Sequence, residues 1–420
     1  MLNIRSETLA AMREMSRPID VSIVMPCLDE AESLPHCIGN AVAALAAIEA
    51  QYGLVGEIIV ADNGSTDRSC ITAELLGARV VRVAERGYGA AILGGCRAAF
   101  GQYLLIGDAD GSYDFVDGTP MIGRLVDGND LCMGSRFRGG VAPGAMPWKN
   151  RYIGNPALTG ILNLFFNTSI EDAHCGLRAI RKDALLTLDL ASSGMEFASE
   201  MIVKASLRRL QIAEVPATLT VDLRNRAPHL RPWRDGWRHL RYLLIMSPMW
   251  ALGVPAIVAM TAGSLVIAVA MLHTLMLGAG TGPFGSSWLI ASGFLITCGH
   301  GAAVTAAAMH LHSVQTGHRL LTPAFARFER WARLEPLLLL GATLIALSLL
   351  LGGTAAYRWT ASSFATPTSV MPIVIAGVLG TLGVQMMFGG MVLAMVRGPG
   401  GETKVRPRAG DVLAGEWDAA

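Results

Sequence analysis

Two acidic residues in the N-terminal half of the chain, Asp108 and Asp110, are the first candidates for chemistry. They follow an apolar run, 103–106, that predicts a buried strand stopping at Gly107. At the carboxyl end of a parallel strand, such a pair projects into the crevice where open α/β sheets bind ligands. Carboxylate oxygens suit Mg²⁺ or Mn²⁺ held jointly with the phosphates of a substrate. A solvated acidic turn is the alternative, because Asp and Gly are ordinary turn residues.

Hydrophobic residues are distributed unevenly along the 420-residue chain, which is long enough for two or three domains. Charged residues are spread through positions 1–245, and long apolar runs then take over. We therefore expect a soluble domain followed by a membrane domain. A formal net charge of +1 gives no indication of nucleic-acid binding. Seven cysteines without a C-x-x-C pair favour reduced thiols over a zinc site or a disulfide framework.

Five short apolar runs in the soluble part are expected to form strands. They lie at 21–25, 57–61, 79–83, 103–106 and 130–133. Helical patterns and short turns separate them, which predicts a mostly parallel sheet with helices on both faces. The polar turns at the carboxyl ends of the strands would then line one edge of the sheet, as in a nucleotide site.

These turns lack the fingerprints of two common nucleotide-binding folds. The first strand runs into Pro26 with no G-x-G-x-x-G, and "RGYGAAILGG" (86–95) lacks the G-K-[ST] of a P-loop. Gly87 and Gly89 in that segment either let the backbone approach a phosphate or begin a glycine-rich helix.

Six segments, taken in order, resemble a known family. They are "VSIVMPCLDEAESL", "IIVADNGSTDRS", "RGYGAAILGG", "IGDADGSYDF", "GSRF" and "DAHCGLRAIRKDAL". Together they resemble glycosyltransferase family 2, most closely its polyprenyl-phosphate and dolichyl-phosphate sugar synthase branch, over residues 20–225. The resemblance implies the GT-A nucleotide-diphospho-sugar transferase fold and transfer of a sugar with inversion.

The same resemblance assigns roles on the donor side. Pro26 and Glu30 resemble the pair that contacts the nucleobase, and Asp62 resembles the acid that holds the base or the ribose. Asp108 and Asp110 match the D-x-D element of the family, with Asp110 as the direct ligand of Mg²⁺ or Mn²⁺.

Three positions depart from the family pattern. Asp29 replaces the usual Asn before the glutamate, and Asn63 replaces the second acid at the end of the second strand. Ser112 stands where this branch often has Gln, which puts a third metal contact in doubt. Asp29, Asn63 and Gly87 remain candidates for binding the donor.

The acceptor side is expected to need cations more than a base. A polyprenyl phosphate is ionised near neutral pH, because its second pKa is about 6. Arg136 and Arg178 resemble acceptor-phosphate contacts, and the planar guanidinium binds phosphate through two bonds. Either one is otherwise a surface arginine. Asp172 is the candidate base if the acceptor is a hydroxyl. The Q-x-x-R-W element of processive polysaccharide synthases is absent.

A basic and aromatic segment, 224–241, precedes the apolar part. It contains Trp233 and Trp237 at helical spacing and six arginines: Arg224, Arg226, Arg231, Arg234, Arg238 and Arg241. This pattern predicts an amphipathic helix at the membrane surface. Four bilayer-spanning stretches follow, at about 250–276, 288–309, 337–356 and 372–396. His300, inside the second, is expected to bond within the helix bundle.

Arginines gather in the segments before the first span, between the second and third, and after the fourth. By the positive-inside rule, the soluble domain and both termini are then cytoplasmic at the cell (inner) membrane. The expected domains are a lead-in (1–19), the transferase domain (20–225), the interfacial helix (226–248), the four-helix membrane domain (249–398) and a tail (399–420).

The sequence therefore predicts a metal-dependent, inverting glycosyltransferase that moves a sugar from a nucleotide-diphosphate sugar to a polyprenyl phosphate at the lipid bilayer. A glycolipid synthase with a lipid hydroxyl acceptor is one alternative. A non-catalytic transport or scaffold protein that senses nucleotide sugars is the other. The sugar, the nucleobase and the oligomeric state, a homo-oligomer included, stay open.

Overall fold

A computed structural model describes residues 18–224, 232–277, 284–316, 323–365 and 369–398. The chain divides into two compact units, one ending at Leu243 and the other beginning at Leu244. The expected lead-in up to position 17, the expected boundary at 225 and the expected tail lie outside the described residues.

The first unit is built on a seven-stranded mixed sheet with the strand order β3-β2-β1-β4-β6-β5-β7. The strands are β1 (Val21–Cys27), β2 (Gly56–Asp62), β3 (Arg79–Arg82), β4 (Tyr103–Ile106), β5 (Leu131–Ser135), β6 (Arg178–Arg181) and β7 (Ile212–Pro216). All five expected strands are present, within two residues at each end. Neither β6 nor β7 was predicted from the sequence.

The direction of each strand decides which loops lie at the same edge of the sheet. β1, β2, β3 and β4 are parallel, so their carboxyl ends reach the same edge of the sheet. β6 is antiparallel to both β4 and β5, and its first residue, Arg178, pairs with Ile106 at the end of β4. The start of β6 and the end of β5 therefore arrive at the edge where β4 ends.

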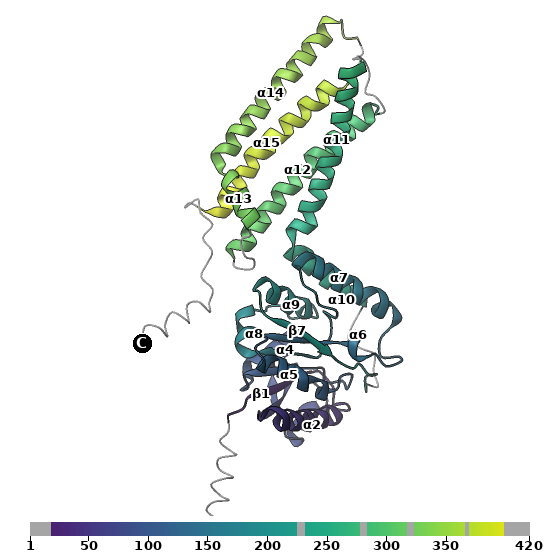
Figure 1. The fold of residues 1–420 in the computed structure, drawn as a ribbon, viewed down its shortest axis with the longest axis vertical. Coiled ribbons are helices and arrows are strands. Elements are labelled where there is room, and N and C mark those ends of the chain that lie inside the picture. Colours follow the sequence, from purple (N-terminus) through teal and green to yellow (C-terminus); the bar gives the residue numbers. More distant parts are fainter. Residues whose placement is uncertain (1–17, 225–231, 278–283, 317–322, 366–368, 399–420) are drawn as a thin grey trace, which may run out of the picture. The chain divides into compact units, whose positions relative to one another are not determined.

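Helices cover both faces of this sheet (Figure 1). The helices between β1 and β7 are α2 (Leu34–Tyr52), α3 (Ser69–Leu75), α4 (Tyr88–Ala98), α5 (Thr119–Val126), α6 (Arg136–Gly139), α7 (Asn155–Phe166), α8 (Lys182–Leu188) and α9 (Phe197–Leu207). Successive residues of a strand point to opposite faces. In β1, Ile23 and Met25 join the core that contains the buried stripe of α2, whereas Val24 faces α4 at Gly95.

Helix α10 (Pro232–Met246) covers the described part of the segment in which an amphipathic helix was expected. Asp235, His239 and Leu243 are buried along one face, while Trp233 and Trp237 are exposed. The part of the basic segment from Asn225 to Arg231 lies outside the described residues.

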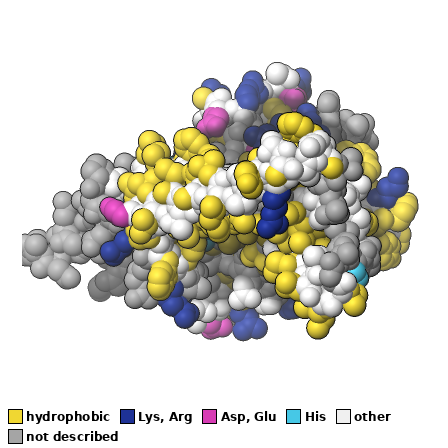
Figure 2. Space-filling view, turned by 90° about the horizontal axis from the view of Figure 1, so that it is seen from above, with side chains coloured by type: hydrophobic (Ala, Val, Ile, Leu, Met, Phe, Trp, Pro, Cys, Tyr) yellow, Lys and Arg dark blue, Asp and Glu magenta, His cyan; other side chains and the backbone are white. Residues whose placement is uncertain are grey.

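The second unit contains four long apolar helices, as expected (Figure 1). They span Met249–Leu277 (η3 and α11), Ser286–Gln315 (α12), Leu334–Ala361 (α14) and Met371–Arg397 (α15). A short helix that was not expected, α13 (Pro323–Trp331), precedes α14. Hydrophobic side chains gather in broad surface patches in the view from above (Figure 2).

Small residues let these helices pack closely. A Cβ on Gly299 of α12 would lie 2.9 Å from the carbonyl oxygen of Ala256, and one on Gly341 of α14 would lie 2.7 Å from that of Gly383. His300 Nδ1 lies 2.8 Å from Gln385 Oε1, so the intramembrane histidine bonds within the bundle, as expected.

Candidate active site

A cavity of about 620 Å³ lies in the first unit, at the edge where β1, β2 and β4 end. Its walls include eight of the candidate residues: Pro26, Glu30, Asn63, Gly87, Asp108, Asp110, Arg136 and Arg178. Three other candidates, Asp29, Asp62 and Asp172, do not line it. The fold thus brings the donor-side and acceptor-side candidates together around one space.

The acidic pair lies in the turn that follows β4. Asp108 Oδ1 accepts a 2.9 Å hydrogen bond from the hydroxyl of Tyr88. Asp110 Oδ1 accepts bonds from the backbone N–H and the hydroxyl of Ser112, at 3.0 and 2.6 Å. Burial, followed by repulsion from Asp110, raises the pKa of Asp108 to about 6. A bound cation would relieve the repulsion between these two carboxylates.

Arg224 completes this acidic end of the cavity. Its Nε lies 2.8 Å from Glu30 Oε1, and its Nη2 lies 3.1 Å from Asp110 Oδ2. Sequence reasoning counted Arg224 among the arginines of the basic segment and gave it no role at the site. No local pattern could have revealed the contact, because 194 positions separate Arg224 from Glu30.

The remaining donor-side candidates shape the loops around the cavity. Asp62 accepts bonds from the backbone N–H groups of Gly64 and Ser65, and Asp29 accepts from that of Thr66. Asn63 Oδ1 accepts from the N–H of Gly87 at 2.7 Å. Asp29 and Asp62 therefore hold the backbone that positions the residues in the wall.

The requirement for glycine at position 87 has a structural cause. Gly87 has a φ of 137°, and a Cβ there would lie 2.1 Å from the carbonyl oxygen of Ser193. The backbone of Ser193 therefore occupies the position that a side chain at residue 87 would need.

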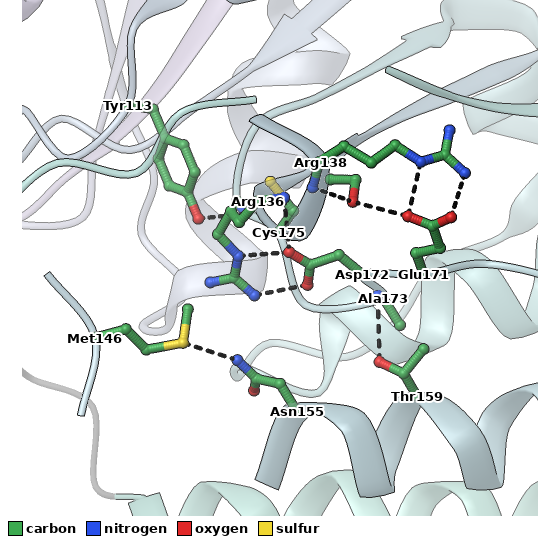
Figure 3. Close-up of polar contacts among 12 residues, drawn as sticks. Tyr113, Arg136, Arg138, Met146, Asn155, Thr159, Glu171, Asp172, Ala173 and Cys175 are labelled. Carbon is green, nitrogen blue, oxygen red and sulfur yellow. Dashed lines mark hydrogen bonds and ion pairs between the residues drawn. The ribbon is translucent and has the colours of Figure 1, made fainter. Parts of the chain in front are cut away.

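The candidate acceptor side contains a buried ion pair (Figure 3). Arg136 follows β5, and its Nε and Nη2 donate to the two carboxylate oxygens of Asp172 at 2.6 and 2.7 Å. Both side chains are more than nine-tenths buried. Asp172 is therefore occupied by Arg136 and does not face the cavity, an arrangement that suits a positioning role better than that of a base.

A second, parallel pair lies beside the first. Arg138 Nε and Nη2 donate to Glu171 at 2.7 and 2.6 Å, but both side chains are about half exposed (Figure 3). The two neighbouring pairs thus differ in burial and in access to the cavity. The exposed pair can therefore serve as a control in mutational tests of the buried pair.

Arg178 differs from Arg136 because none of the described carboxylates forms an ion pair with it, although its charge lowers the pKa of Asp108. Only 3% of its surface is exposed, and its guanidinium donates to the backbone carbonyls of Cys175 and Ala198, at 2.5 and 3.4 Å. None of the described carboxylates lies within 4.0 Å of it. A buried cation that no carboxylate contacts directly is costly, and the position of Arg178 in the cavity wall suits an anionic ligand.

Two histidines in the cavity wall were not singled out from the sequence. The rings of His174 and His239 lie 4.7 Å apart, and His239 Nδ1 lies 2.8 Å from the hydroxyl of Ser199. Burial lowers the pKa of both imidazoles, that of His239 to about 4. They therefore add no charge near pH 7.

The acidic pair also fits a divalent cation. Among the described residues, no group of three or more His, Cys, Asp or Glu side chains could hold a metal. A site with only two carboxylate ligands suits an ion such as Mg²⁺, which keeps several of its waters and takes further oxygen ligands from substrate phosphates.

The fold and the cavity first define a class, namely a membrane protein with an α/β ligand-binding domain. Two family descriptions then match the chain: "Glycosyl transferase family 2" over residues 22–188, and "Glycosyltransferase family 2 C-terminal transmembrane region" over residues 307–397. The hexosyltransferase Agl6 of low-salt glycan biosynthesis from Haloferax volcanii is 34% identical over 89% of this chain and 88% of its own length. The chain belongs to glycosyltransferase family 2 and is a membrane-bound glycosyltransferase.

Two further proteins are similar over the first unit. A dolichyl-phosphate hexose transferase of Haloferax volcanii is 27% identical over 47% of this chain and 81% of its own length. Among solved structures, glucosyl-3-phosphoglycerate synthase from Mycobacterium tuberculosis in complex with Mn²⁺ and uridine-diphosphate-glucose has 21% identity and a TM-score of 0.42. That match covers 54% of this chain and 78% of the other.

Proposed function

We propose that this glycosyltransferase moves a sugar, with inversion, from a nucleotide-diphosphate sugar to a polyprenyl phosphate. The observation that carries the proposal is Arg178, a buried guanidinium in the cavity wall with no carboxylate within 4.0 Å among the described residues. A phosphate monoester would supply the missing charge. The similarity to a dolichyl-phosphate hexose transferase supports the same class of acceptor.

The reaction needs few protein groups. A phosphate oxygen of the acceptor forms a bond to the anomeric carbon as the bond from that carbon to the nucleoside diphosphate breaks, and the electron pair leaves with the diphosphate. The attacking oxygen is already ionised, because the second pKa of a phosphate monoester is about 6. Arg178 and Arg136 hold that oxyanion in line, and no side chain has to remove a proton.

The observed position of Asp172 favours this acceptor over a lipid hydroxyl. A hydroxyl acceptor would need a general base within reach. Asp172, the candidate for that role, is fully buried and bonded through both oxygens to Arg136. Its role in the proposed reaction is to orient Arg136.

Asp108 and Asp110 would hold Mg²⁺ or Mn²⁺ together with the donor phosphates. When bound, that ion neutralises charge on the diphosphate leaving group. Glu30 and Pro26, at the end of β1, would contact the nucleobase. The catalytic unit and both termini are proposed to be cytoplasmic, where nucleotide sugars are made available.

An acceptor assay tests the proposal on the full-length protein. A panel of nucleotide sugars is offered with undecaprenyl phosphate, with undecaprenol or with a diacylglycerol. We expect turnover with the phosphate alone and its loss in Arg178→Gln, with a roughly tenfold to hundredfold effect on kcat/KM for the acceptor. Arg97→Gln, at an exposed position on α4, is the matched control and should retain activity. Transfer to undecaprenol or to the diacylglycerol, undiminished in Arg178→Gln, would contradict the proposal.

A further inference from the structure

One guanidinium joins the two ends of the candidate donor site. Arg224 contacts Glu30, at the end proposed for the nucleobase, and Asp110, at the end proposed for the metal. The inference that follows therefore rests on the proposed function. The side chain of Arg224 is 16% exposed, whereas those of Glu30 and Asp110 are 5% and 11% exposed. The three charges form a compact, largely buried cluster.

A metal that binds the acidic pair has to compete with hydrogen bonds already present. Three of its four carboxylate oxygens accept bonds, from Tyr88, from Ser112 and from Arg224. The bonds from Ser112 come from the same turn and hold Oδ1 of Asp110. The bond from Arg224 is different, because it places a positive charge beside the other oxygen, Oδ2.

We infer that Arg224 is a gating residue, whose guanidinium occupies the donor site until a divalent cation and a nucleotide displace it together. A cation at Asp110 has to replace the Nη2 contact, since two positive groups cannot share one carboxylate oxygen without strong repulsion. A group that binds Glu30 has to replace the Nε contact. Whichever ligand binds first breaks one contact and loosens the other.

Such a gate makes the two ligands cooperative. The first ligand bears the cost of displacing the guanidinium, and the second binds to carboxylates already released. Cooperativity of this kind is reciprocal, so the metal raises the affinity for the nucleotide by the same factor as the nucleotide raises that for the metal. Part of the coupling comes from direct contact of the ion with the diphosphate. The part due to Arg224 disappears when Arg224 is replaced.

Binding of Mn²⁺ to the full-length protein in detergent, followed by the electron paramagnetic resonance signal of free Mn²⁺, tests the gate without any turnover. Titrations are made with Mn²⁺ alone and with UDP or GDP present. We expect Arg224→Gln to bind Mn²⁺ alone roughly tenfold more tightly than the wild type, as befits the loss of one competing charged hydrogen bond. The enhancement by the nucleotide should fall by the same factor. Arg224→Lys, which retains the charge, should lie between the two.

Two variants serve as controls. Arg97→Gln removes an equal charge from an exposed position at the far end of α4 and should leave both titrations unchanged. Asp110→Asn should abolish the tight Mn²⁺ site. If Arg224→Gln and Arg224→Lys bind Mn²⁺ alone like the wild type while the nucleotide still enhances binding, the gate is refuted and the proposed function stands. If no variant binds Mn²⁺ even with UDP or GDP, both the proposed metal role and the gate are refuted.

Discussion

At the scale of single residues, the structure separates side chains that face the cavity from those that support them. The acids of the D-x-D element line the cavity, as their position after a predicted strand indicated, and so do both arginines that the family resemblance had singled out. Asp62 and Asp29 bind backbone N–H groups instead, and Asp172 binds Arg136. Strand ends and residue types are visible in a sequence. The sequence does not show which of two nearby acids faces the cavity, because that depends on hydrogen-bond partners far away in the chain.

The buried pair of Arg136 and Asp172 leads to a prediction about coupling. Removing either partner leaves an unpaired buried charge, which costs about 3–5 kcal/mol of stability. If Asp172 acts only through Arg136, Asp172→Asn should raise the acceptor KM in the wild type and have little additional effect in an Arg136→Ala background. Steady-state kinetics of the two single variants and the double variant measure this coupling.

The neighbouring exposed pair supplies the control for that cycle. Arg138→Ala should change the stability little, because surface ion pairs contribute little, and should leave the acceptor KM unchanged. An Asp172→Asn variant that loses kcat equally in both backgrounds would instead identify Asp172 as a base and the acceptor as a hydroxyl.

At the scale of elements, the strands most easily predicted were those with continuous apolar runs. β1, β2 and β4 have such runs because both of their faces are buried by helices. β6 reads Arg-Ala-Ile-Arg, and its two apolar residues are too few to signal a strand. It forms because β4 and β5 supply hydrogen-bond partners on either side. Arg178 lies on this missed strand. The family motif therefore identified Arg178 as a candidate acceptor contact, but the hydrophobic pattern could not show where in the sheet it lies.

Helix α10 leads to a prediction about pH. Burial lowers the pKa of His239 from 6.5 to about 4, with Arg178 acting in the same direction and Glu196 and Asp235 opposing it. The unfolded chain therefore binds a proton more readily than the folded one. Stability should be full above pH 6.5 and should decrease as the pH falls toward 4, by up to about 3 kcal/mol from this group. The midpoint temperature of thermal unfolding, measured from pH 7 to 4.5, should decrease accordingly.

Replacing His239 should flatten that pH dependence. His239→Gln removes the titrating group, although a residual slope is expected from His174, whose pKa burial also lowers. His36→Gln, at an exposed position on α2, should retain the full slope of the wild type. An unchanged slope in His239→Gln would show that α10 does not bury this imidazole in solution.

At the scale of the whole molecule, the change in composition along the chain predicted two units, and the structure contains two. Length and hydropathy were sufficient to find all four apolar helices within about five residues at most ends. Composition does not reveal how such helices pair. The close approaches at Gly299 and Gly341 and the bond between His300 and Gln385 depend on which faces meet, and that is a property of the folded bundle.

The orientation of the chain in the membrane gives the last prediction. The segment between α12 and α14 contains Arg319, Arg327, Arg330 and Arg333, whereas the segment between α11 and α12 contains no charged residue. Arginine-rich segments stay on the cytoplasmic side during insertion. A reporter fused after Ala420 should therefore be cytoplasmic, and one inserted near Gly282 should be on the opposite side. A cytoplasmic signal at both positions would mean that α11 or α12 does not cross the bilayer, and reversed signals would place the catalytic unit away from the nucleotide sugars that it is proposed to use.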